Sequence, residues 1–398
     1  MVENYQLKEN LWWVGIEDFE MRTFDVIMTT MYGSSFNSYI LKGSEKTVLF
    51  ETEKVKFFDE YKENIESVTS INDIDYIVMN HTEPDHADGI GELLKINPNI
   101  EIYGTMMAIN NLKQIMNRDD FKCHIVKNKE TLSLGDLTLE FNVLPNLHWP
   151  DTMWTYCPEI KALFPCDSFG SHFANKGIVR SKVENEEGYW DAAKYYFDCI
   201  LGPFKPFVQK GLAAFDTMDV ELICTGHGPV LDSHIDEIVQ KYKEWATLPT
   251  HDGKIVAIPY VSAYGYTKML ADAMVEGLKE VNVDSVLYNM EQEDLATVVE
   301  KIIESDGFLL GSPTILGEAL PPIFDITSRL QAGAVMKKPA AAFGSFGWSG
   351  EAVPHLEARL KELRTNVQPG MRVKFKPSEE DLATAKEFGK NFGEIVNG

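Results

Sequence analysis

The sequence predicts an α/β protein built from two domains, on three observations. Its 398 residues exceed what a single hydrophobic core usually organises. Up to about residue 248, short apolar runs alternate with loops rich in His, Asp and Glu, and every plausible metal ligand lies in this part. From residue 254 onward, strand-like and helix-like segments alternate, which indicates a parallel sheet covered by helices on both faces.

The alternation in the C-terminal part can be followed segment by segment. Strand patterns cover residues 254–260, 285–289, 307–311 and 340–344. Helical periodicity covers residues 268–281, 294–305, 355–365 and 380–396. The turn-rich segment 248–253 predicts a short linker, so we expect one domain over residues 1–249 and the other over residues 252–398.

Composition excludes several classes of function. A formal net charge of −24, with 61 acidic against 37 basic residues, argues against a surface for nucleic acid or anionic membrane. No stretch approaches the ~20 apolar residues that span a bilayer, and no signal pattern opens the sequence. The five cysteines are scattered without a C-x-x-C pair, which disfavours disulfides, an iron–sulfur cluster and a rubredoxin-type site. We expect a cytoplasmic protein that binds neither nucleic acid nor membrane.

The segment His81-Thr-Glu-Pro-Asp-His86 is the densest run of potential metal ligands in the chain. Pro84 keeps Glu83 out of the helical region, so we expect an extended segment with alternate side chains on one side, followed by a helix from Asp88. A helix cap from one of the aspartates, with ordinary loop histidines, is the simpler interpretation. Four potential ligands within six residues favour a metal site over that interpretation.

Three more potential ligands, His148, Asp167 and His227, each follow an apolar run, where a loop leaves a predicted strand. Taken singly, such histidines are more often structural. Together with the first cluster they bring the set to four imidazoles and three carboxylates. That set is large enough for two metal ions that share one bridging ligand.

Three strand ends in the C-terminal part carry glycine, hydroxyl and aromatic side chains. Parallel strands bring their carboxyl ends to one edge of a sheet, and a doubly wound sheet of the flavodoxin type holds FMN there. Glycines admit a phosphate close to the backbone, a helix N-terminus attracts it, and aromatic rings could stack on the flavin. Each loop alone is a weak signal, because Ser and Thr also cap helices. The candidate contacts are Ser262, Tyr264, Gly265, Tyr266 and Thr267 in the first loop, Ser312, Pro313 and Thr314 in the second, and Ser345, Phe346, Gly347, Trp348 and Gly350 in the third.

The motif His-x-Glu-x-Asp-His, followed by His148, Asp167 and Gly226-His-Gly228, resembles the flavodiiron version of the metallo-β-lactamase fold. Ser312-Pro-Thr314 and Gly344-Ser-Phe-Gly-Trp-Ser-Gly350 are similar to the flavodoxin half of the same proteins. The resemblance covers nearly the whole chain. It implies an N-terminal αββα sandwich of the metallo-β-lactamase type and a C-terminal flavodoxin-like, doubly wound parallel sheet.

The resemblance also implies a site and an activity. In such a site His81, Glu83 and His148 hold one iron, Asp85, His86 and His227 hold the other, and Asp167 bridges them. The two non-haem irons would reduce dioxygen to water or nitric oxide to nitrous oxide, with electrons that arrive through FMN. A separate rubredoxin is the expected electron donor, with a reduced deazaflavin coenzyme as the alternative. The expected catalytic unit is a head-to-tail homodimer or a dimer of dimers.

Around the irons, we expect His172 and Tyr195 to orient ligands or to donate a hydrogen bond to the bound gas, with packing as the alternative role. Three positions depart from the family pattern: Asp25 stands where some relatives carry a His, Tyr266 where Ser is usual, and Leu316 where Asn is usual. These departures leave the donor in the substrate pocket and the contacts to the flavin open.

A zinc hydrolase of the metallo-β-lactamase fold, with a flavodoxin-like appendage, is the alternative function. Zinc members of that fold carry a second His where this chain has Glu83, and a carboxylate is a harder ligand that favours iron. A non-catalytic flavin carrier with a structural metal is a second alternative. Metal analysis separates the first from a diiron enzyme, and mixing of the reduced protein with each gas separates the second.

Overall fold

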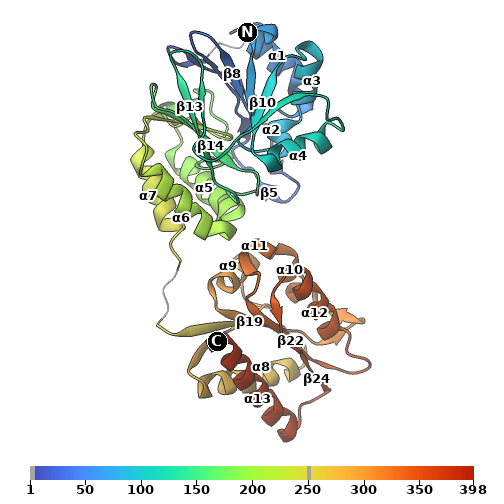
Figure 1. Ribbon diagram of the computed structural model, residues 1–398. Helices are drawn as coiled ribbons and strands as arrows, with labels where there is room; N and C mark the ends of the chain where they lie inside the picture. The colour runs from blue at the N-terminus through green and yellow to red at the C-terminus, as the bar shows by residue number, and fades with distance from the viewer. Residues whose placement is uncertain (1–4, 249–251) are drawn as a thin grey trace. The chain divides into compact units, whose positions relative to one another are not determined.

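A computed structural model describes residues 5–248 and 252–398, in which the chain forms two compact units, residues 1–247 and 248–398 (Figure 1). Part of the predicted linker, residues 249–251, lies outside the described residues. No helix in the described part of the chain is long and apolar enough to cross a membrane.

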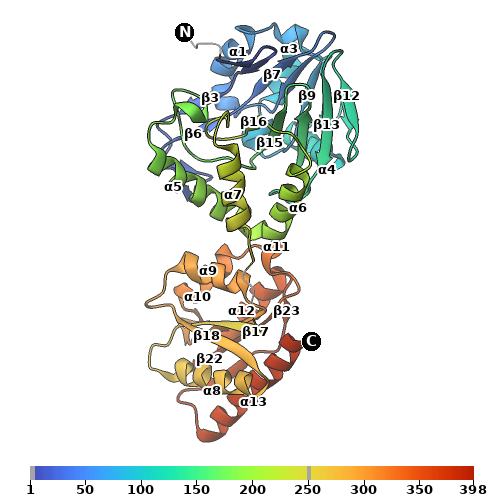
Figure 2. The same cartoon turned by 90° about the vertical axis from the view of Figure 1, so that its left-hand side faces the viewer.

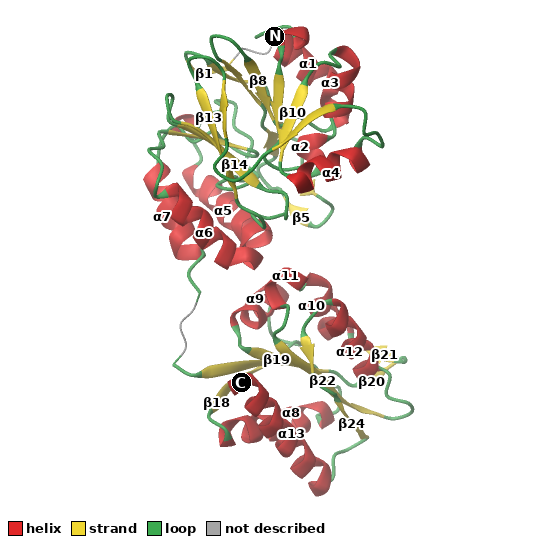
Figure 3. Cartoon of the chain, viewed as in Figure 1, coloured by secondary structure: helices red, strands yellow, loops and turns green. Residues whose placement is uncertain are grey.

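The first unit contains two β-sheets that pack face to face (Figure 3). The larger sheet consists of β1 (Tyr5–Lys8), β2 (Leu11–Trp13), β7 (Tyr39–Lys42), β8 (Thr47–Phe50), β9 (Tyr76–Val78), β10 (Glu101–Gly104) and β11 (Lys122–Ile125), in this spatial order. The smaller sheet consists of β12 (Thr131–Ser133), β13 (Thr138–Val143), β14 (Met153–Cys157), β15 (Ala162–Cys166) and β16 (Leu222–Thr225), also in this order. Two short ladders, β3 (Ile16–Asp18) with β6 (Ser34–Phe36) and β4 (Thr23–Phe24) with β5 (Met28–Thr29), lie outside both sheets.

Helices cover the outer face of each sheet (Figure 1). The larger sheet carries α1 (Phe58–Glu66), α3 (Ile90–Ile96) and α4 (Met106–Ile115), and the smaller sheet carries α5 (Glu186–Tyr196), α6 (Lys205–Phe215) and α7 (Ile235–Trp245). Alternation along a strand explains the layers: Phe50 faces the other sheet, where its ring stacks on Phe164 with centroids 3.8 Å apart, while Leu49 faces the helices. The expected αββα sandwich is therefore confirmed.

The second unit is a parallel sheet with helices on both faces (Figure 2). Its strands are β18 (Val283–Asn289), β17 (Lys254–Tyr260), β19 (Gly307–Gly311) and β22 (Pro339–Phe346), in this spatial order, with β23 (Asn366–Val367) and β24 (Met371–Lys374) both beside β22. One face packs against α8 (Tyr266–Glu280) and α13 (Glu379–Asn397), and the other against α9 (Leu295–Glu304), α10 (Pro321–Arg329), α11 (Ala332–Val335) and α12 (Ala352–Glu362). A short ladder of β20 (Thr314–Ile315) and β21 (Glu318–Ala319) follows β19.

This order confirms the flavodoxin-like, doubly wound fold. The chain passes from β17 to β18 on one side and then to β19 on the other, so the winding reverses between β17 and β19. A ligand binds outside the carboxyl ends of the strands at such a reversal. The loops after these two strands are the first two predicted flavin loops.

One local expectation in the first unit was wrong. The segment after β9 is extended only as far as Glu83, and a short helix, α2, spans Pro84–Ala87, so the alternation does not continue to Asp85. Proline explains the early start, because its fixed φ is suited to the first position of a helix and its missing N–H is not needed there.

Candidate metal centre and flavin site

Seven side chains of the first unit converge at the ends of its strands. The loop after β9 and helix α2 supply His81, Glu83, Asp85 and His86, the loop between β13 and β14 supplies His148, and the loops after β15 and β16 supply Asp167 and His227. Most of these side chains are almost fully buried, with only Glu83 and His148 partly open. Every residue that the sequence offered as a metal ligand is in this group.

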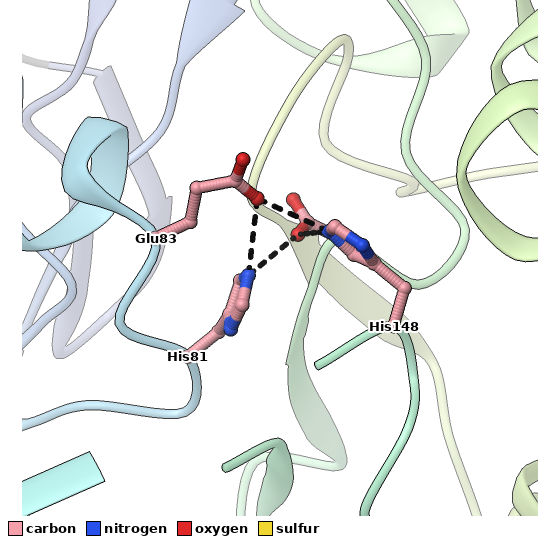
Figure 4. Close-up of side chains that lie close together, drawn as sticks. His81, Glu83 and His148 are labelled. Atoms are coloured by element: carbon pink, nitrogen blue, oxygen red, sulfur yellow. Dashed lines mark hydrogen bonds and ion pairs between the residues drawn. The ribbon is translucent and has the colours of Figure 1, made fainter. Parts of the chain in front are cut away.

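The first half of the centre is formed by His81, Glu83 and His148 (Figure 4). Glu83 Oε2 lies 3.3 Å from His81 Nε2 and 3.1 Å from His148 Nε2. Asp167 Oδ2 closes this half, at 3.5 Å from His81 Nε2 and 3.2 Å from His148 Nε2. Four donor atoms thus point at one position, as the ligands of a single ion must.

The second half is formed by Asp85, His86 and His227. His227 Nε2 lies 3.1 Å from Asp85 Oδ2, and His86 Nε2 lies 3.7 Å from Asp85 Oδ1. The other oxygen of Asp167, Oδ1, faces this half, at 3.1 Å from His86 Nε2 and 3.5 Å from His227 Nε2. Asp167 therefore presents one oxygen to each half, which is the arrangement that a bridging carboxylate requires.

Three residues that the sequence analysis missed hold these side chains from behind. Asp151 Oδ1 lies 3.3 Å from His81 Nδ1, the backbone carbonyl of Ser35 lies 2.6 Å from His227 Nδ1, and the Tyr196 hydroxyl donates to Asp167 Oδ1 at 3.1 Å. When Nδ1 of His81 and of His227 carries the proton and donates it, Nε2 of each of these two rings keeps a lone pair that can bind a metal ion. The helical stripe could have revealed Tyr196, because Tyr189, Ala192–Ala193 and Tyr196 share the buried face of α5.

Of the two residues expected around the irons, His172 is buried beside the centre and Tyr195 is partly exposed. His172 is buried, its Nδ1 lies 2.8 Å from Ser34 Oγ, and its ring lies 5.2 Å from the ring of His227. Burial, and then the neighbouring His227, hold the pKa of His172 well below its usual value, so the ring is neutral. Tyr195 is 41% exposed, and its hydroxyl lies 3.5 Å from Thr29 N. The tyrosine that contacts the centre is Tyr196, the next residue of α5.

The pKa values of the cluster are those expected where metal ions replace the protons on the imidazole rings. Burial lowers the pKa of His86, but the negative charges of Asp85 and Asp167 outweigh it and raise this pKa to about 9. Burial opposes ionisation of Asp167, yet the charge of His86 and further imidazole contacts hold the pKa of this carboxyl well below its usual value. Metal ions would take the place of the imidazole protons, since a ligating imidazole must be neutral. The donor set, imidazole with hard carboxylate, fits iron.

Asp25, the departure from the family pattern in the first unit, lies beside this centre. It occupies the turn between β4 and β5 with a φ of 46°. Partial burial, followed by the charges of Glu83 and Asp85, raises the pKa of Asp25 to about 6. The position that departs from the family pattern therefore carries a carboxyl with a raised pKa.

In the second unit, the three predicted flavin loops meet at one edge of the sheet. Thr267 Oγ1 lies 3.1 Å from Ser345 Oγ, which joins the first loop to the third. A Cβ atom at Gly344 would lie 1.8 Å from the carbonyl oxygen of Ser312, so only glycine permits this approach of the second loop to the third. Gly265 has a φ of 81° at the start of α8, and no atom lies within 4 Å of where its Cβ would be. Open backbone at the N-terminus of a 15-residue helix is suited to a phosphate.

The candidate flavin contacts divide into internal and open residues. Several hydroxyls serve the chain itself: Ser262 Oγ accepts from Lys268 N at 3.1 Å, Ser312 Oγ from Leu320 N at 2.9 Å, and Thr314 Oγ1 from Ala352 N at 3.2 Å. Two aromatic rings are open, because Tyr264 is 79% and Trp348 is 96% exposed. Exposed rings beside an open helix N-terminus are the groups that a flat aromatic ligand would cover. Leu316, a departure from the family pattern, is also fully exposed.

The comparisons with known proteins agree with both halves of this description. Residues 35–228 match the family described as ODP family beta lactamase, and residues 258–389 match Flavodoxin. The flavo-diiron protein FprA2 of Clostridium acetobutylicum is 40% identical over 98% of this chain and 99% of its own length. The anaerobic nitric oxide reductase flavorubredoxin of Klebsiella pneumoniae is 34% identical over 97% of this chain and 80% of its own.

The solved structures give the same result. The rubredoxin oxygen:oxidoreductase of Desulfovibrio gigas matches with a TM-score of 0.69 and 26% identity, over 99% of both chains. Identity at this level along the full length, two matching domain families in the expected order, and the paired clusters joined by Asp167 lead to one conclusion. This chain belongs to the flavodiiron protein family.

Proposed function

We propose that this protein is an oxidoreductase that reduces dioxygen to water, or nitric oxide to nitrous oxide, at a non-haem diiron site, with electrons delivered through FMN. Relatives named nitric oxide reductase and rubredoxin oxygen:oxidoreductase support both gases as substrates. The observation that carries the proposal is the position of Asp167, whose two oxygens face the two imidazole–carboxylate clusters.

In this proposal each residue has a defined role. One iron would be held by His81, Glu83 and His148, the other by Asp85, His86 and His227, and Asp167 would be shared between them. The two irons supply the redox chemistry, and the protein supplies position and charge. The three carboxylates would balance most of the charge of two ferrous ions, which lowers the cost of burying them.

Reduction of either gas consumes protons, so the centre needs groups that hold them. His172 is neutral, and its Nε2 has no hydrogen-bond partner among the described residues, so this nitrogen is free to donate to or accept from a bound gas or water. The Tyr196 hydroxyl donates to Asp167 and keeps that carboxylate oriented. We assign His172 and Tyr196 to the surroundings of the gas, in place of the expected Tyr195.

The flavin would bind at the three loops of the second unit. The open N-terminus of α8 at Gly265 would hold the phosphate of FMN, and Tyr264 and Trp348 would cover the flavin ring. We propose domain limits of residues 1–249 for the diiron part and residues 252–398 for the FMN part. In the described part of the chain no disulfide joins any of the five cysteines, which supports a reducing cytoplasm as the location.

The electron donor would be rubredoxin, which the name of the Desulfovibrio relative supports, with a reduced deazaflavin coenzyme as the alternative. The catalytic unit would be a head-to-tail homodimer, alone or paired into a dimer of dimers, with the FMN of one copy beside the irons of the other. Exposed apolar side chains in both units support this: Val26, Ile27 and Met31 lie in and just after the β4–β5 turn, where Asp25 interacts with Glu83, and Tyr264 and Trp348 lie at the flavin loops.

The test is anaerobic. Protein expressed with ample iron should contain two irons and one FMN per chain, and the reduced protein should be reoxidised by dioxygen, by nitric oxide, or by both in stopped-flow mixing. Zinc in place of iron would indicate the hydrolase instead. If the reduced, iron-loaded protein reacts with neither gas, the remaining interpretation is a non-catalytic flavin carrier.

A further inference from the structure

The two halves of the centre have the same kinds of ligand. Each contains two imidazoles, one carboxylate of its own and one oxygen of Asp167. Ligand count and ligand type therefore give no reason for the two irons to differ. The difference lies in the groups that contact the ligands from behind.

The first half is backed by an anion. Asp151 is fully buried, and its Oδ1 lies 3.3 Å from His81 Nδ1. Its other oxygen, Oδ2, accepts from Thr82 N at 2.7 Å and from Thr82 Oγ1 at 2.6 Å, so the carboxylate cannot turn away from the ring. A carboxylate behind an imidazole pulls on its Nδ1 proton and makes the opposite nitrogen a stronger electron donor. Burial strengthens the effect, because little water screens it.

The hydrogen-bond partners behind the second half are neutral. The buried carboxyl of Glu51 acts on the charge of His86, but His86 Nδ1 has no hydrogen-bond partner among the described residues. His227 Nδ1 lies 2.6 Å from the carbonyl oxygen of Ser35, which is a weaker acceptor than a carboxylate. The buried Tyr196 hydroxyl donates to Asp167 Oδ1, the oxygen that faces this half, at 3.1 Å. Asp167 Oδ2, which faces the first half, receives no such donation among the described contacts. A donated hydrogen bond withdraws electron density from the oxygen that accepts it.

We propose that Asp151 and Tyr196 make the two irons unequal, so that the iron held by His81, Glu83 and His148 is oxidised before the iron held by Asp85, His86 and His227. This inference rests on the proposed diiron function. Stronger donors favour the ferric over the ferrous state, because the higher charge gains more from them. In each step one ferrous ion loses one electron to an added oxidant such as ferricyanide, and the protein ligands stay the same.

The test is a redox titration of the iron-loaded, FMN-loaded protein and of the variants Asp151→Asn and Tyr196→Phe. Electron paramagnetic resonance follows the half-oxidised centre, and Mössbauer spectroscopy counts ferric and ferrous ions. Asp151→Asn should raise the midpoint potential of the first oxidation and leave the second in place. Tyr196→Phe should lower the midpoint of the second. At a fixed potential we expect the ratio of ferric to ferrous ion to change about tenfold, which is about 59 mV for one electron.

The direction of the shifts separates this role from a structural one. Loosened packing in a variant would move both midpoints in the same direction. The proposal instead requires Asp151→Asn to raise only the first midpoint and Tyr196→Phe to lower only the second. Each variant then narrows the difference between the two midpoint potentials. Tyr242→Phe is the matched control, since Tyr242 is equally buried and packs on Phe169, and it should move neither midpoint. A second readout is iron affinity, which Asp151→Asn should weaken about 10- to 100-fold in the first half.

The outcomes are distinguishable. Folded, iron-loaded variants with unchanged midpoints, or with both midpoints shifted in one direction, would overturn the inference and leave the diiron function intact. A wild-type protein that takes up fewer than two irons would overturn the proposed function and the inference together. If Asp151→Asn does not fold, the lowered second midpoint in Tyr196→Phe decides the matter.

Discussion

Glu83 Oε2 lies 3.1 Å from His148 Nε2, so a carboxylate from the loop after β9 meets an imidazole from the loop before β14. Zinc members of the metallo-β-lactamase fold resemble this chain but carry a second His at the position of Glu83. We predict that Glu83→His shifts the first half of the centre from iron to zinc, because it replaces a hard ligand with a borderline one.

Metal content after expression with equal iron and zinc measures the change. Glu83→Gln is the matched control, since it removes the carboxylate without adding an imidazole, and it should lose iron without gaining zinc. Retention of both irons in Glu83→His would show that this carboxylate does not decide between iron and zinc, and retention of both irons in Glu83→Gln would show that Glu83 is not a ligand.

A second prediction concerns the bridge. Asp167→Ala should reduce the rate of gas reduction by more than about 100-fold, since loss of a direct ligand exceeds the 10- to 100-fold cost of losing a group behind a ligand. FMN should stay bound, because Asp167 and the flavin loops belong to different compact units. Iron analysis, flavin absorbance and stopped-flow mixing measure the three quantities. Asp232→Ala, which removes an exposed carboxylate that accepts from Ser181, should change none of them.

The third prediction concerns the pH dependence of stability. Lys338 donates to the carbonyl oxygens of Ile302, Ile303 and Ser305, and burial lowers the pKa of its ammonium group to about 8, although Asp306 and Glu304 oppose the shift. Between pH 8 and the ordinary lysine pKa of about 10.4, the unfolded chain binds more protons than the folded one. The free energy of unfolding should therefore rise with pH across this window, by at most about 3 kcal/mol.

Denaturant unfolding at several pH values checks this. The difference between wild type and Lys338→Met isolates the lysine, because every other group titrates in both proteins. The neighbouring, exposed Lys337→Met serves as the control and should keep the slope of the wild type. A constant difference between wild type and Lys338→Met would mean that Lys338 keeps its proton on folding.

The sequence was sufficient to predict which side chains gather in the cluster, but not which groups contact them from behind. The ligands follow strands in short motifs, and a strand end fixes where a side chain can reach, so His81 and Asp167 could be placed without a structure. The contact of Asp151 with His81 spans 70 residues and depends on how two loops meet, which no local pattern encodes. Tyr196 was accessible through the stripe of buried positions in α5, whereas Tyr195 was the residue predicted.

The same limit applies to the second unit. Alternating apolar runs placed β17, β19 and β22 to within a few residues, because buried parallel strands are continuously hydrophobic. No helix or strand was predicted over residues 321–335, where α10 and α11 lie. Helix α10 begins at Pro321-Pro322, a pair that is tolerated in the first turn of a helix but also marks loops, so the pattern was ambiguous.

The last prediction concerns the composite site. If each flavin serves the irons of the other copy, two inactive variants should restore activity when their subunits exchange. His81→Ala removes a ligand of the first half. Gly347→Trp crowds the third flavin loop, because even a Cβ atom at this position would lie 3.1 Å from the ring of Phe375. In a mixed head-to-tail dimer, one of the two composite sites pairs an intact flavin with an intact diiron centre, so about half of the wild-type turnover per mixed dimer is expected.

Iron and FMN analysis first establishes that each variant lacks only its own group. Subunit exchange is then followed with differently labelled copies, and turnover is measured in the same mixture. Dimers that combine Tyr242→Phe with Gly347→Trp give the matched control, because Tyr242→Phe leaves the centre intact and should yield the same half activity. Restored turnover that grows with the fraction of mixed dimers would support electron transfer between copies. Complete exchange without turnover, or full activity in a protein shown to be monomeric, would mean that each chain reduces its own irons.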